Sequence, residues 1–297
     1  MNIELLKYFK DIADAKSISK VAANSHISQS ALSQMIQKLE DNIGYEIFLR
    51  SNKGVELTES GKILYDYTVK IIKIYHKMID EMSSISKGQY KITINSTWAI
   101  TDYSLPAVLI EMKKRYPLIN YEIHSFRSED IIKNVENGLA DFGIICGDFD
   151  SKILDFYHLI NDKILFVAGR HFNVPEKITA DELLKYKIIY FKTGCYNDDI
   201  TKALAKHATT KPYNLNPLLN LDSITAVKSS TMEGYGISFL PKSTIKKELE
   251  YGSLKIVHIE GVDFDLRVDI ICLNDFKLKY YIKKIIEDFV KIGTKLA

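Results

Sequence analysis

The chain has 297 residues, of which 46% are hydrophobic and 26% are charged, and its formal net charge is +2. These values are ordinary for a globular protein of two to three domains, each with its own apolar core. We expect neither a membrane-spanning helix nor a secretory signal, because no apolar run approaches about 18 residues and no basic segment precedes one at the N-terminus. The small net charge excludes a globally basic nucleic-acid binder, so any affinity for DNA has to come from local placement of charge.

Residues 3–42 predict three helices in succession. Apolar side chains recur at helical spacing over residues 3–14, which indicates an amphipathic first helix. Ser17 can cap a short second helix over residues 18–24, and Ser28 can cap a third helix that runs to about Asn42. Two helices joined by a tight turn are the elements of a helix-turn-helix.

The third helix has two chemically distinct faces. Its apolar face is formed by Ala31, Leu32, Met35, Ile36 and Leu39. The opposite face follows the capping Ser28 and carries Gln29, Ser30, Ser33, Gln34, Gln37 and Lys38. Amides and hydroxyls near a helix N-terminus suit base edges in the major groove of DNA, where glutamine can pair with adenine. The alternative is an amide-rich face that only meets water, and the flanking helix and turn favour the DNA interpretation.

Two short extended runs follow, over residues 47–50 and 55–57, with a turn between them. They predict a two-stranded wing that is tipped by Arg50, Asn52 and Lys53. We expect these side chains to contact DNA phosphates, which position a protein without reading sequence.

Residues 59–86 predict one long helix with Thr58 as its cap. Its apolar residues step by three and four in a heptad seam of Leu64, Tyr67, Ile71, Ile74 and Met78, which Met82 and Ile85 continue with a shift of one residue. The seam predicts pairing with a second chain, which would present two third helices to two DNA half-sites. The alternative is a helix that packs on its own domain. The polar run over residues 83–88 predicts a hinge.

From residue 90 onward, strand-like and helix-like runs alternate. Strands are expected at 90–95, 120–125, 141–146, 164–168, 188–191, 218–221, 237–240 and 267–273. Helices are expected at 106–116, 130–137, 179–186, 197–208, 223–233, 242–250 and 276–291, and the chain is expected to cross between two halves near residue 161. This alternation implies an α/β fold with open, mostly parallel sheets and helices on both faces.

The strand ends of this α/β region predict a binding site. In open α/β sheets, ligands bind beyond the carboxyl ends of strands, where helix N-termini present free N–H groups. The residues there that we expect to bind an effector are Ser96, Thr97, Trp98, Arg127, Ser128, Cys146, Thr193, Gly194 and Ser223. Hydroxyl and N–H groups favour a carboxylate or another small anion, and Arg127 can add a bidentate clamp. The alternatives are that the serines and threonines cap helices, that Arg127 is a surface cation and that Trp98 is a core anchor.

Several motifs occur together in the order that is typical of LysR-type transcriptional regulators, which the chain resembles over essentially its whole length. In the DNA-binding domain they cover residues 6–9, 17–22, 28–33, 36–40, 43–50 and 57–61. In the effector domain they cover residues 105–106, 116–117, 137–144 and 234–241. Two positions depart from the common pattern, because proline is frequent at the place of Ser30 and arginine at the place of Gln34.

The resemblance implies a division into domains. A winged helix-turn-helix would span residues 1–58, a linker helix and hinge residues 59–88, and an effector domain residues 89–297. The effector domain would have two Rossmann-like lobes that resemble those of periplasmic binding proteins, with the ligand between them. Lobe I would comprise 90–161 and 268–297, and lobe II would comprise 162–267.

The resemblance also implies what the protein binds. Double-stranded promoter DNA with an interrupted palindrome would be contacted by Gln29, Ser30, Ser33, Gln34 and Arg50. Two dimers would form a homotetramer, a small molecule would act as the effector, and RNA polymerase is a further partner that this role allows. We expect no cofactor, no metal and no membrane contact, and a location in the cytoplasm.

Three other functions fit parts of the sequence less well. An enzyme is disfavoured because no HExxH, GxSxG, P-loop or GxGxxG pattern occurs and the seven histidines are scattered. A secreted solute-binding protein would share the sensor fold, but the N-terminal domain opposes it. A thiol-based redox regulator would use Cys195 in a predicted cleft loop, whereas Cys146 and Cys272 lie in apolar strands and are expected to be small core residues. Three cysteines without a CxxC pair predict neither a disulfide framework nor a zinc site.

Overall fold

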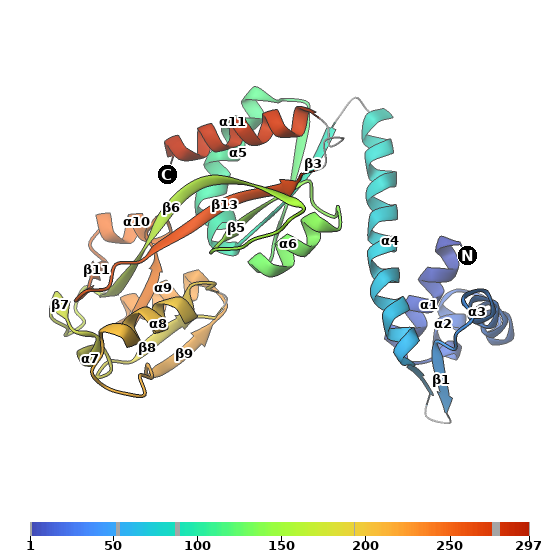
Figure 1. Ribbon diagram of the computed structural model, residues 1–297, viewed down its shortest axis with the longest axis horizontal. Coiled ribbons are helices and arrows are strands. Elements are labelled where there is room, and N and C mark those ends of the chain that lie inside the picture. Colours follow the sequence, from blue (N-terminus) through green and yellow to red (C-terminus); the bar gives the residue numbers. More distant parts are fainter. Residues whose placement is uncertain (1, 52–53, 87–89, 193, 275–279, 297) are drawn as a thin grey trace. The chain divides into compact units, whose positions relative to one another are not determined.

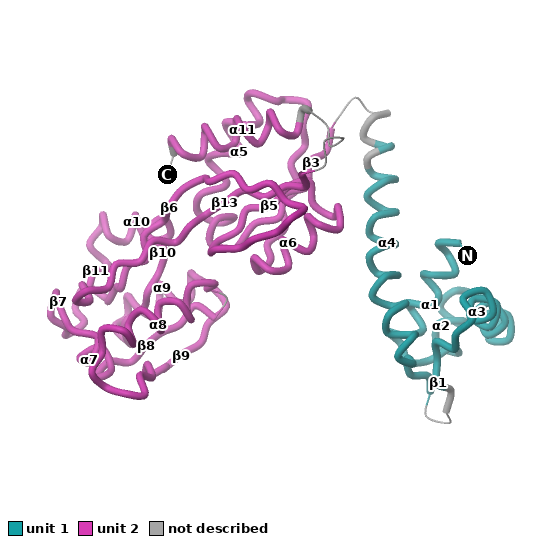
Figure 2. Tube along the Cα trace, in the orientation of Figure 1, with its two compact units in different colours: residues 1–88 teal, residues 89–297 magenta. Residues whose placement is uncertain are grey.

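The computed structural model of the chain describes residues 2–51, 54–86, 90–192, 194–274 and 280–296. It divides into two compact units, residues 1–88 and residues 89–297 (Figure 2). Each unit has its own apolar core. Within the described ranges, none of the helices combines the length and the apolar character needed to cross a bilayer.

Three capped helices form the first part of unit 1. They are α1 (Ile3–Ala15), α2 (Ile18–Asn24) and α3 (Gln29–Ile43). Each cap is a side-chain oxygen that accepts a hydrogen bond from the backbone N–H three residues later, and the capping residues are Asn2, Ser17 and Ser28. These bonds satisfy donors that a first helical turn leaves without partners. The apolar sides of the helices meet in one core that includes Phe9, Ile12, Val21, Ala22, Leu32, Ile36 and Leu39.

The wing is an antiparallel pair that is anchored to the end of α1. Its strands are β1 (Phe48–Ser51) and β2 (Gly54–Leu57). The N–H of Val55 donates to the carbonyl oxygen of Lys16, at 3.2 Å. At Gly54, φ is +125° and an added Cβ would lie 2.6 Å from that same carbonyl oxygen. Only glycine therefore allows the strand to approach α1 this closely.

A buried carboxylate joins α3 to the wing. Glu40 lies in the last turn of α3 and is 8% exposed. Its Oε1 accepts hydrogen bonds from the N–H groups of Ile47 at 2.9 Å and Phe48 at 3.3 Å. Buried N–H groups without partners are costly, so this side chain fixes the path of the chain from α3 into β1.

The long helix α4 (Glu59–Ser86) begins on unit 1. Thr58 caps it, because its Oγ1 accepts a hydrogen bond from the N–H of Gly61 at 2.9 Å. The hydroxyl of Tyr65 donates to Asp14 of α1 at 2.5 Å, and Leu64 packs against the unit 1 core. The first two turns of α4 thus pack on the three helices of unit 1, and α4 has the length that the sequence predicted.

Unit 2 alternates strands and helices around a nine-stranded mixed sheet. The strands of this sheet are β3 (Tyr90–Ser96), β4 (Ile119–Ser125), β5 (Phe142–Cys146), β6 (Leu154–Gly169), β8 (Ile188–Phe191), β9 (Pro217–Leu221), β10 (Ile237–Pro241), β11 (Leu254–Ile256) and β13 (Asp265–Leu273). A separate short pair consists of β7 (Lys177–Ile178) and β12 (His258–Ile259). The helices are η1 (Ile100–Ser104, a π-helix), α5 (Leu105–Arg115), α6 (Ser128–Glu136), α7 (Ala180–Leu183), α8 (Asn197–His207), α9 (Ile224–Met232), α10 (Lys242–Glu250) and α11 (Tyr280–Leu296).

The sheet order is β4-β3-β5-β13-β6-β10-β8-β9, with β11 paired to β6. β3 runs parallel to β4 and β5, and β8 runs parallel to β9 and β10. The expectation of mostly parallel sheets is corrected at the centre, where β6 and β13 are antiparallel to their neighbours. The reason is that the chain leaves the first lobe along β6 and returns beside it along β13. In that first lobe, α5 and α11 cover one face of the sheet and α6 covers the other (Figure 1).

The crossover between the lobes is a bent pair of strands. β6 is continuous over Leu154–Gly169, so it extends well before the predicted strand at 164–168. Its register against β13 shifts between Val268, which pairs with Ile160, and Asp269, which pairs with His158. A bulge of this kind bends a strand pair, and it lies beside the predicted crossover at residue 161.

The π-helix η1, which has no counterpart among the elements predicted from sequence, ties the first lobe to the second. The ring of its Tyr103 lies 4.6 Å from the ammonium of Lys228 in α9. Lys228 is 7% exposed and forms an ion pair with Glu248 at 2.6 Å. Trp98 and Ala99, just before η1, pack together with Tyr103 against a core cluster of the second lobe that includes Val227. Local π-helical turns are frequent at functional sites.

We predict that Glu40→Ala destabilises unit 1, because it leaves two buried N–H groups without their acceptor. Its free energy of unfolding should fall by about 2 kcal/mol, and less for Glu40→Gln, which keeps one acceptor oxygen. Urea unfolding followed by circular dichroism measures this change. The neighbouring exposed carboxylate supplies the control, since Asp41→Asn should stay within about 0.5 kcal/mol of the parent. Equal stability of Glu40→Ala and the parent would contradict the role of Glu40.

Candidate functional site

The polar face of α3 is open to solvent. Gln29, Ser30, Gln34, Gln37 and Lys38 are all exposed, and Ser33 is half-buried. On the other face, Leu32, Ile36 and Leu39 are each 0% exposed. One residue is corrected: Met35 was assigned to the apolar face but is 39% exposed, beside the polar one. The core holds a narrower stripe of α3 than the helical spacing predicted.

The structure describes Ser28 in full, but most of the wing residues that were predicted to contact DNA lie outside the described part of the chain. Ser28 Oγ accepts the N–H of Ala31 at 3.1 Å and lies 3.0 Å from Ser30 Oγ, so it is engaged in the cap. The side chain of Arg50, and all of Asn52 and Lys53, lie outside the described residues. Their predicted phosphate contacts stay predictions.

Beyond its first two turns, α4 exposes a row of large apolar side chains. They are Tyr67 (61% exposed), Ile71 (39%), Ile74 (45%), Met78 (46%) and Met82 (62%). These are the residues of the predicted seam, without Leu64, which packs on unit 1, and Ile85, whose side chain is not described. An apolar row of this length on an exposed helix is typical of a surface that another chain covers.

Unit 2 contains a cavity of about 320 Å³ between the two halves of its sheet. Its first wall follows the carboxyl ends of β3, β4 and β5 and is lined by Thr97, Trp98, Ala99, Arg127, Ser128, Glu129 and Cys146. Its second wall follows β8 and opens α8, and is lined by Phe191, Lys192, Gly194, Cys195, Tyr196, Asn197 and Asp198. Pro241 and Leu266 complete it at the crossover. The cavity thus lies where ligands bind in α/β sheets, beside the first turns of α6 and α8.

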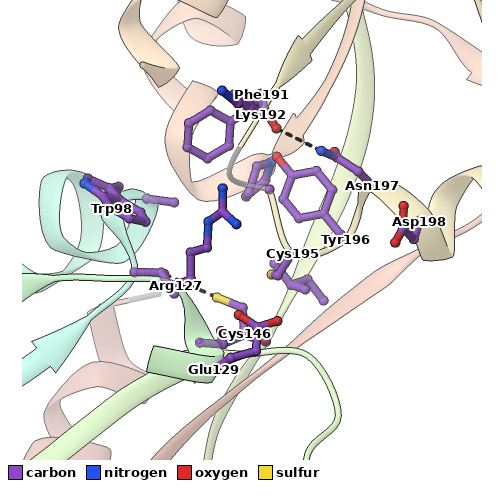
Figure 3. A pocket seen from close by; sticks show the side chains of 16 residues that line it. Trp98, Arg127, Glu129, Cys146, Phe191, Lys192, Cys195, Tyr196, Asn197 and Asp198 are labelled. Carbon is purple, nitrogen blue, oxygen red and sulfur yellow. Dashed lines mark hydrogen bonds between the residues drawn. The ribbon is translucent and has the colours of Figure 1, made fainter. Parts of the chain in front are cut away.

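Charged and aromatic groups share this cavity. Figure 3 shows the side chain of Arg127 reaching between Trp98 and Tyr196. Burial raises the pKa of Tyr196 well above its usual value, so its hydroxyl stays neutral, and it donates to the carbonyl oxygen of Phe239 at 3.4 Å. Lys192 adds a second cation, and two carboxylates also line the walls, those of Glu129 and Asp198. A ligand with a single negative charge fits this balance better than a polyanion does.

The structure brings six of the predicted effector residues together. They are Thr97, Trp98, Arg127, Ser128, Cys146 and Gly194. Ser96 is 0% exposed and Ser223 accepts the N–H of Ala226 as the cap of α9, so neither of these two lines the cavity. Thr193 lies outside the described residues.

Ser128 lines the cavity and also holds the backbone of Cys146 in place. It is 2% exposed, and its Oγ accepts the N–H of Cys146 at 3.1 Å and donates to the carbonyl oxygen of Cys146 at 3.0 Å. This pair of bonds fastens the start of α6 to the end of β5. Thr97 Oγ1 lies 3.5 Å from the sulfur of Cys146. Cys146 is 3% exposed and belongs to the apolar core, as expected, and its side chain also lines the cavity.

Most of the second wall was missed by sequence reasoning. Lys192 and Asn197 lie within three residues of the predicted Gly194, so a wider window around that strand end would have included them. Asn197 also fixes the loop, because its Nδ2 donates to the carbonyl oxygen of Phe191 at 2.9 Å. No local sequence pattern marks Pro241 or Leu266 as cavity residues, because they reach the cavity only through the path of the crossover strands. Across the described residues, no group of three or more metal-binding side chains gathers.

Two family models match the chain. Residues 3–62 match the model described as a bacterial regulatory helix-turn-helix protein of the lysR family, and residues 86–289 match the LysR substrate binding domain. Among similar proteins, a probable RuBisCO transcriptional regulator of Trieres chinensis is 25% identical over 268 residues, which are 88% of this chain and 87% of the relative. An uncharacterized HTH-type transcriptional regulator of Methanocaldococcus jannaschii is 29% identical over 267 residues, with 87% and 89% covered.

Solved structures share the fold over the full length. The crystal structure of CbnR, a LysR family transcriptional regulator, has a TM-score of 0.74 at 17% identity, with 99% of each chain covered. Full-length CbnR in complex with its target DNA has a TM-score of 0.75 at 18% identity, with 100% of each chain covered.

Proposed function

The chain belongs to the LysR family of bacterial transcription regulators, and we propose that it reads promoter DNA with α3, in pairs held by α4, under the control of a small carboxylate bound in the cavity of unit 2. The observation that carries the proposal is the exposed amide and hydroxyl face of α3, because Leu32, Ile36 and Leu39 on the opposite side are fully buried. Nothing in this role calls for catalysis or a cofactor.

In the proposed complex, α3 enters the major groove with its N-terminal half toward the bases. Gln29 and Gln34 would form bidentate hydrogen bonds with adenine, and Lys38 would contact a phosphate. The exposed Met35 offers an apolar surface to a thymine methyl group. Phosphate contacts from the wing would add affinity that falls as salt is raised.

We predict that Gln29→Ala reduces sequence discrimination and leaves non-specific binding intact. The loss of one bidentate base contact should cost about 1–3 kcal/mol, or roughly 5- to 150-fold, in the ratio of specific to scrambled DNA binding. Gel shifts with duplexes from upstream of the chain's own gene measure this ratio. Asn42→Ala, an exposed amide at the far end of α3, should leave it unchanged. Unchanged discrimination in Gln29→Ala would refute base reading by this residue.

The exposed apolar row of α4 supports the proposal of a dimer. Two copies of α4 that bury these side chains against each other would hold two DNA-binding units at a fixed spacing, which suits an interrupted palindrome. The alternative, a helix packed on its own domain, is disfavoured because the row from Tyr67 to Met82 is exposed. Assembly of two such dimers into a tetramer is part of this proposal, and it follows from the family.

We predict that Ile71→Asp dissociates the α4 pair, because it would bury a carboxylate in an apolar seam. Sedimentation velocity should show a smaller species, and affinity for a palindromic duplex should fall more than affinity for a single half-site. Lys73→Gln changes an exposed charge on the same helix, off the seam, and should leave the mass unchanged. A variant Ile71→Asp with the parent's mass would exclude α4 as the main contact.

The cavity supports a small carboxylate as the effector. Arg127 projects into it, Thr97 adds a hydroxyl, and Trp98 supplies an aromatic wall. Elements of both lobes line the cavity, so a ligand can bind one lobe arrangement better than another. Only such a difference in affinity shifts the equilibrium between DNA-binding states.

We predict that a binding carboxylate changes the emission of Trp98, the only tryptophan in the chain, which makes fluorescence a direct report on the cavity. In Arg127→Ala the affinity for that ligand should fall by about 1.5–3 kcal/mol, or roughly 10- to 150-fold, because a charge-assisted hydrogen bond is lost. The exposed Arg170 lies outside the cavity lining, so Arg170→Ala should bind as the parent does. Equal affinity of Arg127→Ala and the parent would remove Arg127 from the site.

The proposed role also implies a location in the cell and a further partner. As a bacterial regulator of promoters, the protein would work on genomic DNA in the cytoplasm, and contact with RNA polymerase at the promoter would couple binding to transcription. A solute-binding role is disfavoured because the chain carries the helix-turn-helix unit.

A further inference from the structure

Two of the three cysteines meet in the cavity of unit 2. Cys146 ends β5 on the first wall, and Cys195 lies between β8 and α8 on the second wall. Figure 3 shows their side chains close to each other at the base of the cavity. Cys272, in β13, is buried and does not line it. The pair therefore joins segments that are about fifty residues apart in sequence, one from each lobe.

The surroundings of the pair favour one reactive sulfur and one partner. A hydrogen bond from the thiol of Cys195 lowers the pKa of Cys146, and Thr97 acts in the same direction, whereas burial opposes both. The same bond raises the pKa of Cys195. Cys195 is exposed, so a small reagent can reach the pair through the cavity. A thiolate with a second thiol beside it is the arrangement in which oxidation ends as a disulfide.

We propose that Cys146 and Cys195 form a reversible disulfide across the cavity when the protein meets a small hydroperoxide. The Cys146 thiolate attacks one peroxide oxygen, the O–O bond breaks, and the leaving alkoxide takes up a proton to become an alcohol, or water in the case of hydrogen peroxide. Cys146 is then a sulfenic acid. The sulfur of Cys195 attacks it, the S–O bond breaks, and hydroxide leaves with the Cys195 proton as water. Two thiols and one hydroperoxide thus give one disulfide, one alcohol and one water, and a dithiol reductant reverses the change.

The disulfide would link the two walls of the cavity that both lobes form. It would fix one lobe arrangement and occupy the space beside Arg127 and Thr97, so that oxidation and ligand binding compete. This consequence rests on the effector function proposed above. Formation of the disulfide itself rests only on the position of the two thiols.

The test uses the full chain, reduced and then treated with a small excess of hydrogen peroxide. Free thiols are alkylated, and the protein is digested without reductant for mass spectrometry. We expect two of the three thiols to be lost and one peptide pair, Cys146 with Cys195, to appear and to vanish after a dithiol reductant. Cys195→Ser should stop at a sulfenic acid on Cys146 that dimedone traps. Cys272→Ser is the matched control and should form the same disulfide as the parent.

A second readout separates this proposal from the effector function. Oxidation should change the emission of Trp98 in the parent and in Cys272→Ser, and should leave it unchanged in Cys146→Ser, because the disulfide forms in the cavity that Trp98 lines. Retention of all three thiols, a disulfide between chains, or one that contains Cys272 would overturn the proposal. Formation with diamide but not with hydrogen peroxide would overturn the peroxide step. Absence of carboxylate binding would instead refute the effector function and leave the disulfide result standing.

Discussion

The burial of one side of α3 governs how unit 1 can act. Leu32, Ile36 and Leu39 are fully buried against α1 and α2, so the helix cannot rotate without exposing them to water. Each such side chain is worth about 1.5–3 kcal/mol in the core, which fixes the opposite face outward. The amides and hydroxyls of that face are held on a rigid support, and Glu40 ties the same helix to the wing. Rigid placement would lower the entropic cost of the proposed base reading.

Unit 2 is built to couple its two lobes. The strands β6 and β13 run through both lobes, bend at the bulge beside Val268, and leave the cavity between the strand ends on either side. The π-helix after β3 brings Tyr103 against Lys228 of the second lobe, so a change at Trp98 lies next to an interlobe contact. The proposed ligand, or the proposed link between Cys146 and Cys195, would act where both lobes contribute atoms.

Local patterns in the sequence predicted the elements that depend on local physics. The caps at Ser17 and Ser28 and the seam of α4 are short-range features, so their bounds agree with the structure within about a residue or two. The first part of β6 was missed because its apolar residues are interleaved with Asp155, His158 and Asn161, and its strand form depends on pairing with β13.

The cavity shows the same limit at the level of single residues. The strand-end rule found Thr97, Arg127 and Cys146, but it also selected Ser96, which turns into the core. Pro241 and Leu266 enter the wall only through the crossover. The encounter of Cys146 with Cys195 depends on both lobes and has no counterpart in their spacing along the chain.

The direct test of the central claim is methylation protection by dimethyl sulfate on an operator selected from random duplexes. If α3 occupies the major groove, guanine N7 atoms should be protected in two half-sites a whole number of helical turns apart; an operator bound with no N7 protection in either half-site would contradict the account.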